Sequence, residues 1–113
     1  MTDFAEEAKA RIFYSDLLGI PEVAKPVHLA ARGGCWFECG VLKIHLGVDP
    51  DFVAARKAHP AFIVDGLLEL VGTLQKAGYP VREDQPLDGY ERRYVHDPFG
   101  NRIELMQPWA PFS

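Results

Sequence analysis

The sequence predicts an α+β fold in which two helices and seven short strands form two similar halves. Three observations lead to this prediction. An amphipathic segment opens the chain, a second one lies in its latter half, and short apolar runs bounded by Gly and Pro fill the rest. The order is α-β-β-β and then β-α-β-β-β, which indicates an internal duplication whose first half lacks its opening strand. We expect the helices to cover the outer faces of a curled mixed sheet, whose inner face forms a cleft.

The first helix is expected to begin at Asp3, because Asp3 and Glu6 have the spacing of a capping box. It is expected to end at Gly19, with Pro21 just beyond it. Apolar residues recur at helical spacing and predict the buried stripe of this helix: Phe4, Ala8, Ile12 and Leu18.

Three strands of the first half are expected at residues 26–31, 35–39 and 41–47. Cys35 and Cys39 lie on one face of the second strand, too far apart along an extended chain for a disulfide. We interpret both as small core residues, since two thiols alone do not complete a zinc site.

The second half is expected to begin with a strand at residues 59–64 and to continue with an amphipathic helix that Gly78 stops. The inward side chains of this helix are expected to be Leu67, Leu70, Val71 and Leu74. Three further strands, near residues 80–84, 91–96 and 102–107, complete the prediction.

The segment from Asp97 to Asn101 has the composition of a tight turn and leads into a strand that carries Glu104. On this strand Glu104 shares a face with Arg102, while Ile103 lies on the other face. A carboxylate at the floor of a cavity needs a cation or a metal to offset its desolvation. The alternative is a surface ion pair between Arg102 and Glu104.

Composition excludes several classes of function. The chain has 113 residues, a net charge of -4 and a pI near 5.5, so it has no electrostatic footprint for nucleic acid. No apolar run approaches the roughly 20 residues that cross a membrane, and the first residues are acidic where a secretory signal is basic. We therefore expect a cytoplasmic location. The sequence contains no phosphate-binding glycine loop, no zinc-protease motif and no serine nucleophile elbow.

Three segments together resemble the vicinal oxygen chelate superfamily, which includes glyoxalase I, bleomycin resistance proteins, fosfomycin-modifying thiol transferases and extradiol dioxygenases. They are ARIFYSDLLG at residues 10–19, HPAFIV at 59–64 and YVHDPFGNRIEL at 94–105. The resemblance runs from Ala8 to Gln107 and implies paired βαβββ modules that curl around a divalent-metal site. We expect one domain over residues 1–113, with modules at about 1–48 and 59–107.

The resemblance implies three metal ligands, His45, His59 and Glu104. The family's remaining ligand lies on the first strand of the first module, which this sequence lacks. Imidazole and carboxylate together suit Zn, Ni, Fe, Mn or Co. The alternatives are that His59 caps a strand beside Pro60 and that His45 is a neutral side chain in a polar pocket.

Substrate-binding residues are expected around these ligands. Tyr94 and Arg92 share one strand face, and Trp36 lies on the face of its strand opposite the cysteines. If these faces line the cleft, they suit a small polar or anionic molecule with an aromatic or apolar part. The alternative is that Arg92 and Arg93 belong to a solvated edge.

The resemblance implies a small metal-dependent enzyme, a lyase or dioxygenase of the glyoxalase type, that acts on a molecule with vicinal oxygens. Glu104 would be both ligand and base. The alternative is a metal-free protein that sequesters an antibiotic-like or aromatic ligand, so whether the chain is an enzyme stays open. The missing strand leaves a sheet edge unpaired and predicts a homodimer, unless the natural chain begins upstream with that strand.

Overall fold

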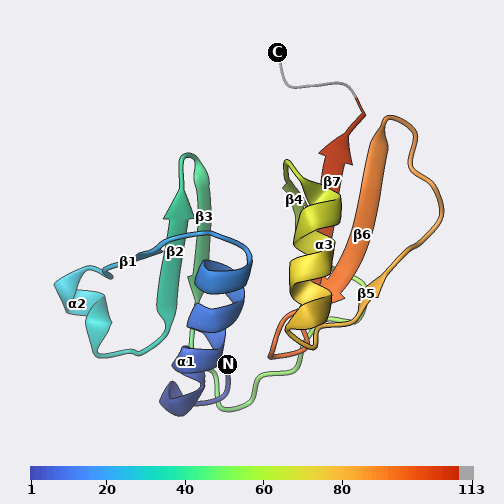
Figure 1. The fold of residues 1–113 in the computed structure, drawn as a ribbon. Helices are drawn as coiled ribbons and strands as arrows, with labels where there is room; N and C mark the ends of the chain where they lie inside the picture. Colours follow the sequence, from blue (N-terminus) through green and yellow to red (C-terminus); the bar gives the residue numbers. More distant parts are fainter. Residues whose placement is uncertain (110–113) are drawn as a thin grey trace. The chain divides into compact units, whose positions relative to one another are not determined.

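The computed structural model describes residues 1–109, which divide into two compact units, Met1–Val53 and a second that begins at Ala54 (Figure 1). Each unit combines helix with its own sheet. The α+β class is therefore confirmed, and within residues 1–109 neither sheet closes into a barrel. No helix in this part of the chain is long and apolar enough to cross a membrane.

The first unit begins with a helical segment made of η1 (Phe4–Glu6), α1 (Glu7–Ala10) and the π-helix η2 (Arg11–Leu17). The predicted capping box is present: the Asp3 carboxylate accepts the Ala5 N–H at 2.6 Å, and the Glu6 carboxylate accepts the Asp3 N–H at 3.2 Å. No strand precedes this segment in the described residues, as the element order predicted.

The predicted buried stripe of this helical segment is wrong. Phe4 is 56 % exposed and Ile12 is 50 % exposed, whereas Ala10, Phe13 and Tyr14 are buried. The segment ends in a π-helical turn, whose hydrogen bonds reach five residues back, as between the Leu18 N–H and the Phe13 carbonyl at 3.0 Å. The buried residues Ala10, Phe13 and Tyr14 still have helical spacing, so the segment packs through a different face from the predicted one.

The first sheet is antiparallel, with the order β1 (Glu22–Val23), β2 (Cys35–Cys39) and β3 (Leu42–Leu46). The strand expected at residues 26–31 is instead the short helix α2 (Val27–Ala30). Pro26 begins this helix with its fixed φ, and leucine and alanine favour a helical turn over a strand. The place beside β2 belongs to β1, which is too short to leave a sequence pattern.

The two cysteines occupy different environments. Cys35 is buried in the core of the first unit, as expected, but Cys39 is exposed at the end of β2. The prediction that both are core residues is therefore wrong for Cys39, which is the last residue of β2 and lies beside the turn at Gly40.

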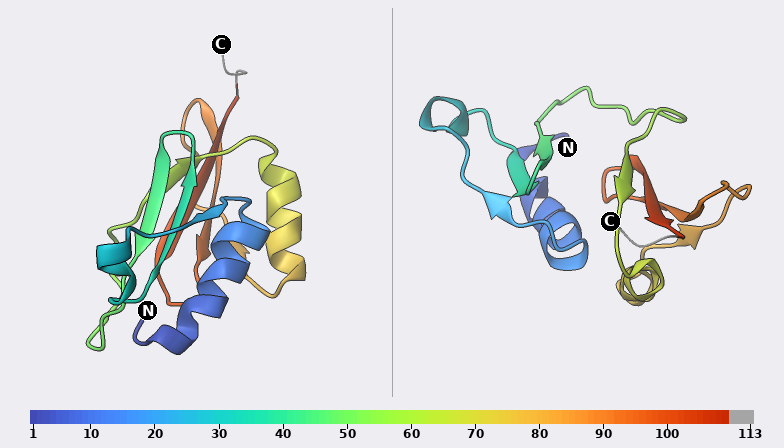
Figure 2. Two further views of the ribbon diagram at one scale, coloured as in Figure 1. Left: turned by 90° about the vertical axis from the view of Figure 1, so that its left-hand side faces the viewer. Right: turned by 90° about the horizontal axis from the view of Figure 1, so that it is seen from above.

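The second unit contains β4 (Ala61–Ile63), α3 (Leu67–Lys76), β5 (Val81–Arg82), β6 (Tyr90–His96) and β7 (Arg102–Pro108). The strand order is β4-β7-β6-β5, with β4 parallel to β7 and the other pairs antiparallel. This is the predicted β-α-β-β-β module. Helix α3 covers one face of the sheet (Figure 2), and its side chains Leu67 and Leu74 are fully buried.

The turn between β6 and β7 fixes the register of the site. The Asp97 carboxylate accepts the N–H groups of Phe99 at 2.9 Å and Asn101 at 2.8 Å, and the Asn101 side-chain amide at 2.8 Å. Gly100 has a φ of +87°, a conformation that favours glycine. These local bonds satisfy a buried carboxylate and set Tyr94 directly opposite Glu104 on the paired strands.

Candidate functional site

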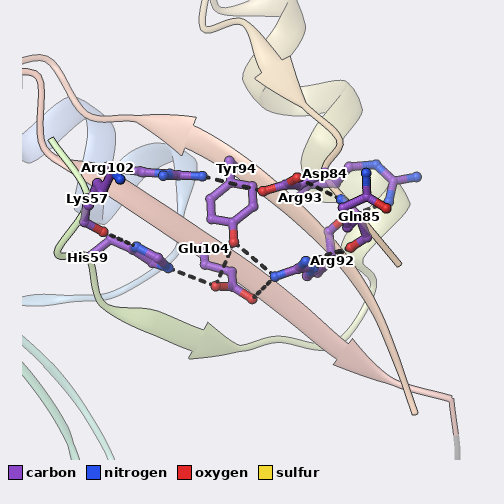
Figure 3. A network of polar contacts seen from close by, with 9 residues as sticks. All are labelled: Lys57, His59, Asp84, Gln85, Arg92, Arg93, Tyr94, Arg102 and Glu104. Carbon is purple, nitrogen blue, oxygen red and sulfur yellow. Dashed lines mark hydrogen bonds and ion pairs between the residues drawn. The ribbon is translucent and has the colours of Figure 1, made fainter. Parts of the chain in front are cut away.

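The candidate site lies on the face of the second sheet opposite α3. The strand register places Arg82, Tyr94, Glu104 and Ala61 in one row across β5, β6, β7 and β4. Side chains in such a row project to the same face of the sheet. The segment that enters β4 brings His59 to this row, so residues from distant parts of the chain meet at Glu104 (Figure 3).

His59 and Glu104 are in direct contact. The His59 Nε2 lies 2.9 Å from the Glu104 Oε1, while the His59 Nδ1 lies 2.7 Å from the Lys57 carbonyl oxygen. A carbonyl only accepts hydrogen bonds, so Nδ1 carries a proton and Nε2 is the nitrogen that faces the carboxylate. When Nε2 is also protonated it donates a hydrogen bond to the Glu104 Oε1, and when it is not, its lone pair is free to bind a cation beside the carboxylate.

Tyr94 and Arg92 hold the same carboxylate from the other side. The Tyr94 hydroxyl donates to the Glu104 Oε1 at 3.1 Å, and the Arg92 Nη1 lies 3.5 Å from the Glu104 Oε2. The Arg92 Nη1 also donates to the Tyr94 hydroxyl oxygen at 2.9 Å. The three side chains therefore form one network in which Glu104 is only 6 % exposed (Figure 3).

The sequence left open a surface ion pair between Arg102 and Glu104, and the structure does not contain this pair. The Arg102 guanidinium lies over the Tyr94 ring, 4.0 Å from its centroid, and pairs with Asp84 at 3.7 Å. Arg92 is the cation beside Glu104. Its guanidinium also donates to the Gln85 carbonyl at 3.1 Å from Nε, so it is held in place and is not a free edge residue.

Electrostatics keep Glu104 ionised. Burial alone would raise the pKa of Glu104, but hydrogen bonds from His59, Tyr94 and Arg92 favour the carboxylate and leave its pKa below the ordinary value. Burial and the neighbouring Glu104 carboxylate raise the pKa of Tyr94 above its ordinary value. Tyr94 is therefore a hydrogen-bond donor at neutral pH, and Glu104 is an acceptor.

The remaining predicted site residues form a group within the first unit. The Trp36 and His45 rings stack with their centroids 3.7 Å apart and an interplanar angle of 3°. The His45 Nε2 lies 3.3 Å from the Glu38 carboxylate, which Lys43 also approaches at 3.0 Å. Hydrogen bonds from Lys43 and His45 lower the pKa of Glu38. Trp36 and His45 line a hollow of about 350 Å³ in this unit.

Two backbone groups that orient side chains of the site were not predicted from the sequence. They are the carbonyls of Lys57 and Gln85. They fix the His59 ring and the Arg92 guanidinium respectively. Backbone carbonyls carry no residue signature, and both belong to irregular segments, so no pattern in the sequence could have indicated them.

Comparison with known proteins identifies the family. Residues 6–105 match the model of the Glyoxalase/Bleomycin resistance protein/Dioxygenase superfamily. The chain belongs to this superfamily. No curated protein matches it significantly.

Solved structures of this superfamily resemble the chain over most of its length. One is a protein assigned to the glyoxalase family from Bacillus anthracis, with 47 % identity, a TM-score of 0.85, and coverage of 91 % of this chain and 84 % of that one. A glyoxalase/dioxygenase from Nostoc punctiforme has 20 % identity and a TM-score of 0.75, covering 97 % and 86 %. The fosfomycin resistance protein FosX from Listeria monocytogenes has 16 % identity and a TM-score of 0.73, covering 95 % and 85 %. The last two share the fold.

Members of the superfamily typically use divalent metals. Within either unit of the described chain, no three His, Cys, Asp or Glu side chains gather into a metal site. His59 and Glu104 nevertheless supply a pair of donors, with an imidazole tautomer that a backbone carbonyl fixes. Metal-bound histidines commonly have such a carbonyl partner on the other ring nitrogen. The donor chemistry therefore fits two of the positions around an ion.

Proposed function

We propose that this chain is a small metal-dependent enzyme of the glyoxalase and dioxygenase type that acts on a small molecule with vicinal oxygens. One observation carries the proposal: the His59 Nε2 and the Glu104 Oε1 converge at 2.9 Å while the other imidazole nitrogen donates to the Lys57 carbonyl. These two potential ligand atoms lie side by side in a buried network, where a bound cation would take the place of the proton that joins them.

His59 and Glu104 would hold the ion, and His45 of the first unit is the proposed third ligand. Imidazole and carboxylate donors suit Zn, Ni, Fe, Mn or Co. When bound, such a metal supplies a Lewis acid that polarises adjacent oxygens of a substrate. Water or a residue of a partner chain would occupy the position that the absent first strand leaves open.

The chain's own residues would perform the rest of the reaction. Glu104 is ionised and can accept a proton, and Tyr94 and Arg92 fix the orientation of its carboxylate. The Arg92 guanidinium and the Tyr94 hydroxyl are also the donors that would orient a substrate oxygen at this face. Trp36 would provide an aromatic surface for the apolar part of the molecule.

A second candidate function is the metal-free sequestration of an antibiotic-like or aromatic ligand. It is favoured by the hydrogen bonds from Tyr94 and Arg92 to Glu104, because they offset the charge of this carboxylate without a metal. The two functions differ in whether an ion occupies the His59–Glu104 pair.

Metal analysis of the protein, purified without a chelator or a metal-affinity tag, distinguishes the two functions. We expect near-stoichiometric metal in the parent protein and a loss of most of it in His59→Ala and Glu104→Gln. His45→Ala tests the third ligand, and His28→Ala is the matched control because His28 is an exposed histidine on α2. Metal content that is unchanged in both His59→Ala and Glu104→Gln would remove the metal site. A metal-free parent that binds aromatic ligands would support sequestration.

We further propose that the protein acts as a homodimer. Within the first unit β3 pairs only with β2, so one edge of this sheet has no partner strand there. Unpaired edges are commonly covered by another chain. The cytoplasmic location stays a prediction of the sequence.

A further inference from the structure

A basic hollow of about 200 Å³ lies in the second unit, and of its lining residues the function proposed above uses only Tyr94. Three arginines line it, Arg56, Arg82 and Arg102, together with His96 and the ring of Tyr94. The carboxylates of Glu83 and Asp84 are also at its wall. Arginine guanidiniums in such number around a small space are the groups that recognise carboxylates and phosphates.

The hollow adjoins the Glu104 network on the same face of the sheet. Arg82 pairs with Tyr94 in the register of β5 and β6, and Tyr94 pairs with Glu104 in that of β6 and β7. Tyr94 belongs to both places: its hydroxyl donates to Glu104, and its ring lines the hollow under the Arg102 guanidinium. A molecule held by the arginines would therefore lie against the tyrosine that contacts the Glu104 carboxylate.

The positive charge of the hollow is only partly neutralised. Glu83 pairs with Arg93 at 3.2 Å, and Arg93 is not a lining residue. Asp84 pairs with Arg102 at 3.7 Å. Neither Arg56 nor Arg82 forms an ion pair with any residue from 1 to 109. Two guanidiniums are thus available to an anion, and a single carboxylate competes for the third.

We propose that this hollow binds the oxyanionic group, a carboxylate or a phosphate, of a small molecule. In so far as that molecule is the substrate of the neighbouring Glu104 network, the inference rests on the function proposed above. Anion binding by the arginines itself does not depend on a metal at His59 and Glu104. The substrate would accordingly be a small acid whose anionic group lies in the hollow and whose reacting oxygens lie on the Glu104 side of Tyr94.

Titration with inorganic phosphate and, separately, with acetate tests the proposal at constant ionic strength. Binding is followed by the amide NMR signals of β5, the 83–85 segment and His96. We expect saturable shifts there with at least one anion, and the stronger response identifies phosphate or carboxylate. Arg82→Gln and Arg56→Gln should each weaken binding about tenfold, the loss expected for one charge-assisted hydrogen bond. Arg32→Gln is the matched control, an exposed arginine outside the hollow.

A gain of affinity provides a test that misfolding cannot imitate. Asp84→Asn removes the carboxylate that competes for Arg102, so it should tighten anion binding. The absence of saturable shifts with both anions, or equal affinity in the parent, Arg82→Gln and Arg56→Gln, would overturn the proposal. Glu104→Gln separates the two proposals: anion shifts that persist when metal uptake is lost place the anion in the hollow. A parent that binds anions but no metal would overturn the metal-dependent function and leave the hollow as an anion site.

Discussion

The His59 Nε2 meets the Glu104 Oε1 at 2.9 Å although 45 positions separate the two residues in the sequence. The parallel pairing of β4 with β7 causes this contact, because Ala61 lies opposite Glu104 and the Glu104 N–H donates to the Pro60 carbonyl at 3.0 Å. The segment that enters β4 therefore carries His59 to the side of the carboxylate. The parallel pairing of these strands thus brings together two potential metal ligands from opposite ends of the module, His59 and Glu104.

Tyr94→Phe should destabilise the protein by about 1–3 kcal/mol, the cost of removing a hydrogen-bonding partner from a buried polar group. The Tyr94 hydroxyl donates to Glu104 and accepts from Arg92, and Tyr94 is 6 % exposed. Urea unfolding measures the change. Tyr90→Phe is the control, since no hydrogen bond of the Tyr90 hydroxyl is formed among the described residues. Equal effects of the two substitutions would show that the network does not stabilise the fold.

The stability that Glu104 contributes should depend on pH. Its pKa in the folded state is lower than the ordinary value of 4.5, since hydrogen bonds from His59, Tyr94 and Arg92 outweigh the effect of burial. The folded state therefore binds fewer protons there than the unfolded state. The contribution is present above pH 4.5 and is lost as the pH falls through the lowered pKa.

Urea unfolding of the metal-free protein from pH 7 to 3 measures this dependence. The difference in unfolding free energy between the parent and Glu104→Gln should narrow in the acid range. Glu69→Gln, on the exposed surface of α3, should show no comparable change. A difference between the parent and Glu104→Gln that stays constant across this range would contradict the prediction.

The two thiols should differ strongly in reactivity. Burial raises the pKa of Cys35 to about 11, whereas Cys39 is exposed. The thiolate is the reactive form, so a disulfide reagent at pH 8 should modify Cys39 rapidly and Cys35 only after unfolding. Because the pKa of Cys35 is raised, folding favours its thiol; this contribution is present below pH 9 and is lost as the pH rises through about 11. Equal modification rates of the two thiols in the native protein would contradict the assignment. Rapid modification of the Cys39→Ser variant, whose remaining thiol is Cys35, would also contradict it.

The proposed homodimer predicts a mass in solution of twice the chain's 12.7 kDa. Light scattering coupled to size-exclusion chromatography over a dilution series measures it. The free edge of β3 within the first unit is the physical reason to expect association. A particle with the mass of one chain at micromolar concentration would rule the dimer out.

The sequence by itself determined the features that a few neighbouring residues decide. The Asp97–Asn101 turn, the capping box at Asp3 and the helix α3 all formed as predicted. In each, the backbone conformation follows from local hydrogen bonds and from the preferences of a few residue types. The order of these elements was enough to predict the β-α-β-β-β module and the absence of an opening strand in the first unit.

Tertiary structure decided which residues pack and which charges meet. The first helical segment packs through Phe13 and Tyr14 and leaves Phe4 and Ile12 exposed, because helical spacing offers more than one apolar face and only contact with the sheet decides which one is buried. Arg102 lies two residues from Glu104 on the same strand face, yet its guanidinium lies over the Tyr94 ring and Arg92 of the next strand reaches the carboxylate. Spacing gives only the face on which a side chain lies. The partner depends on strand register and on rotamers that neighbouring side chains select, and these exist only in the folded chain.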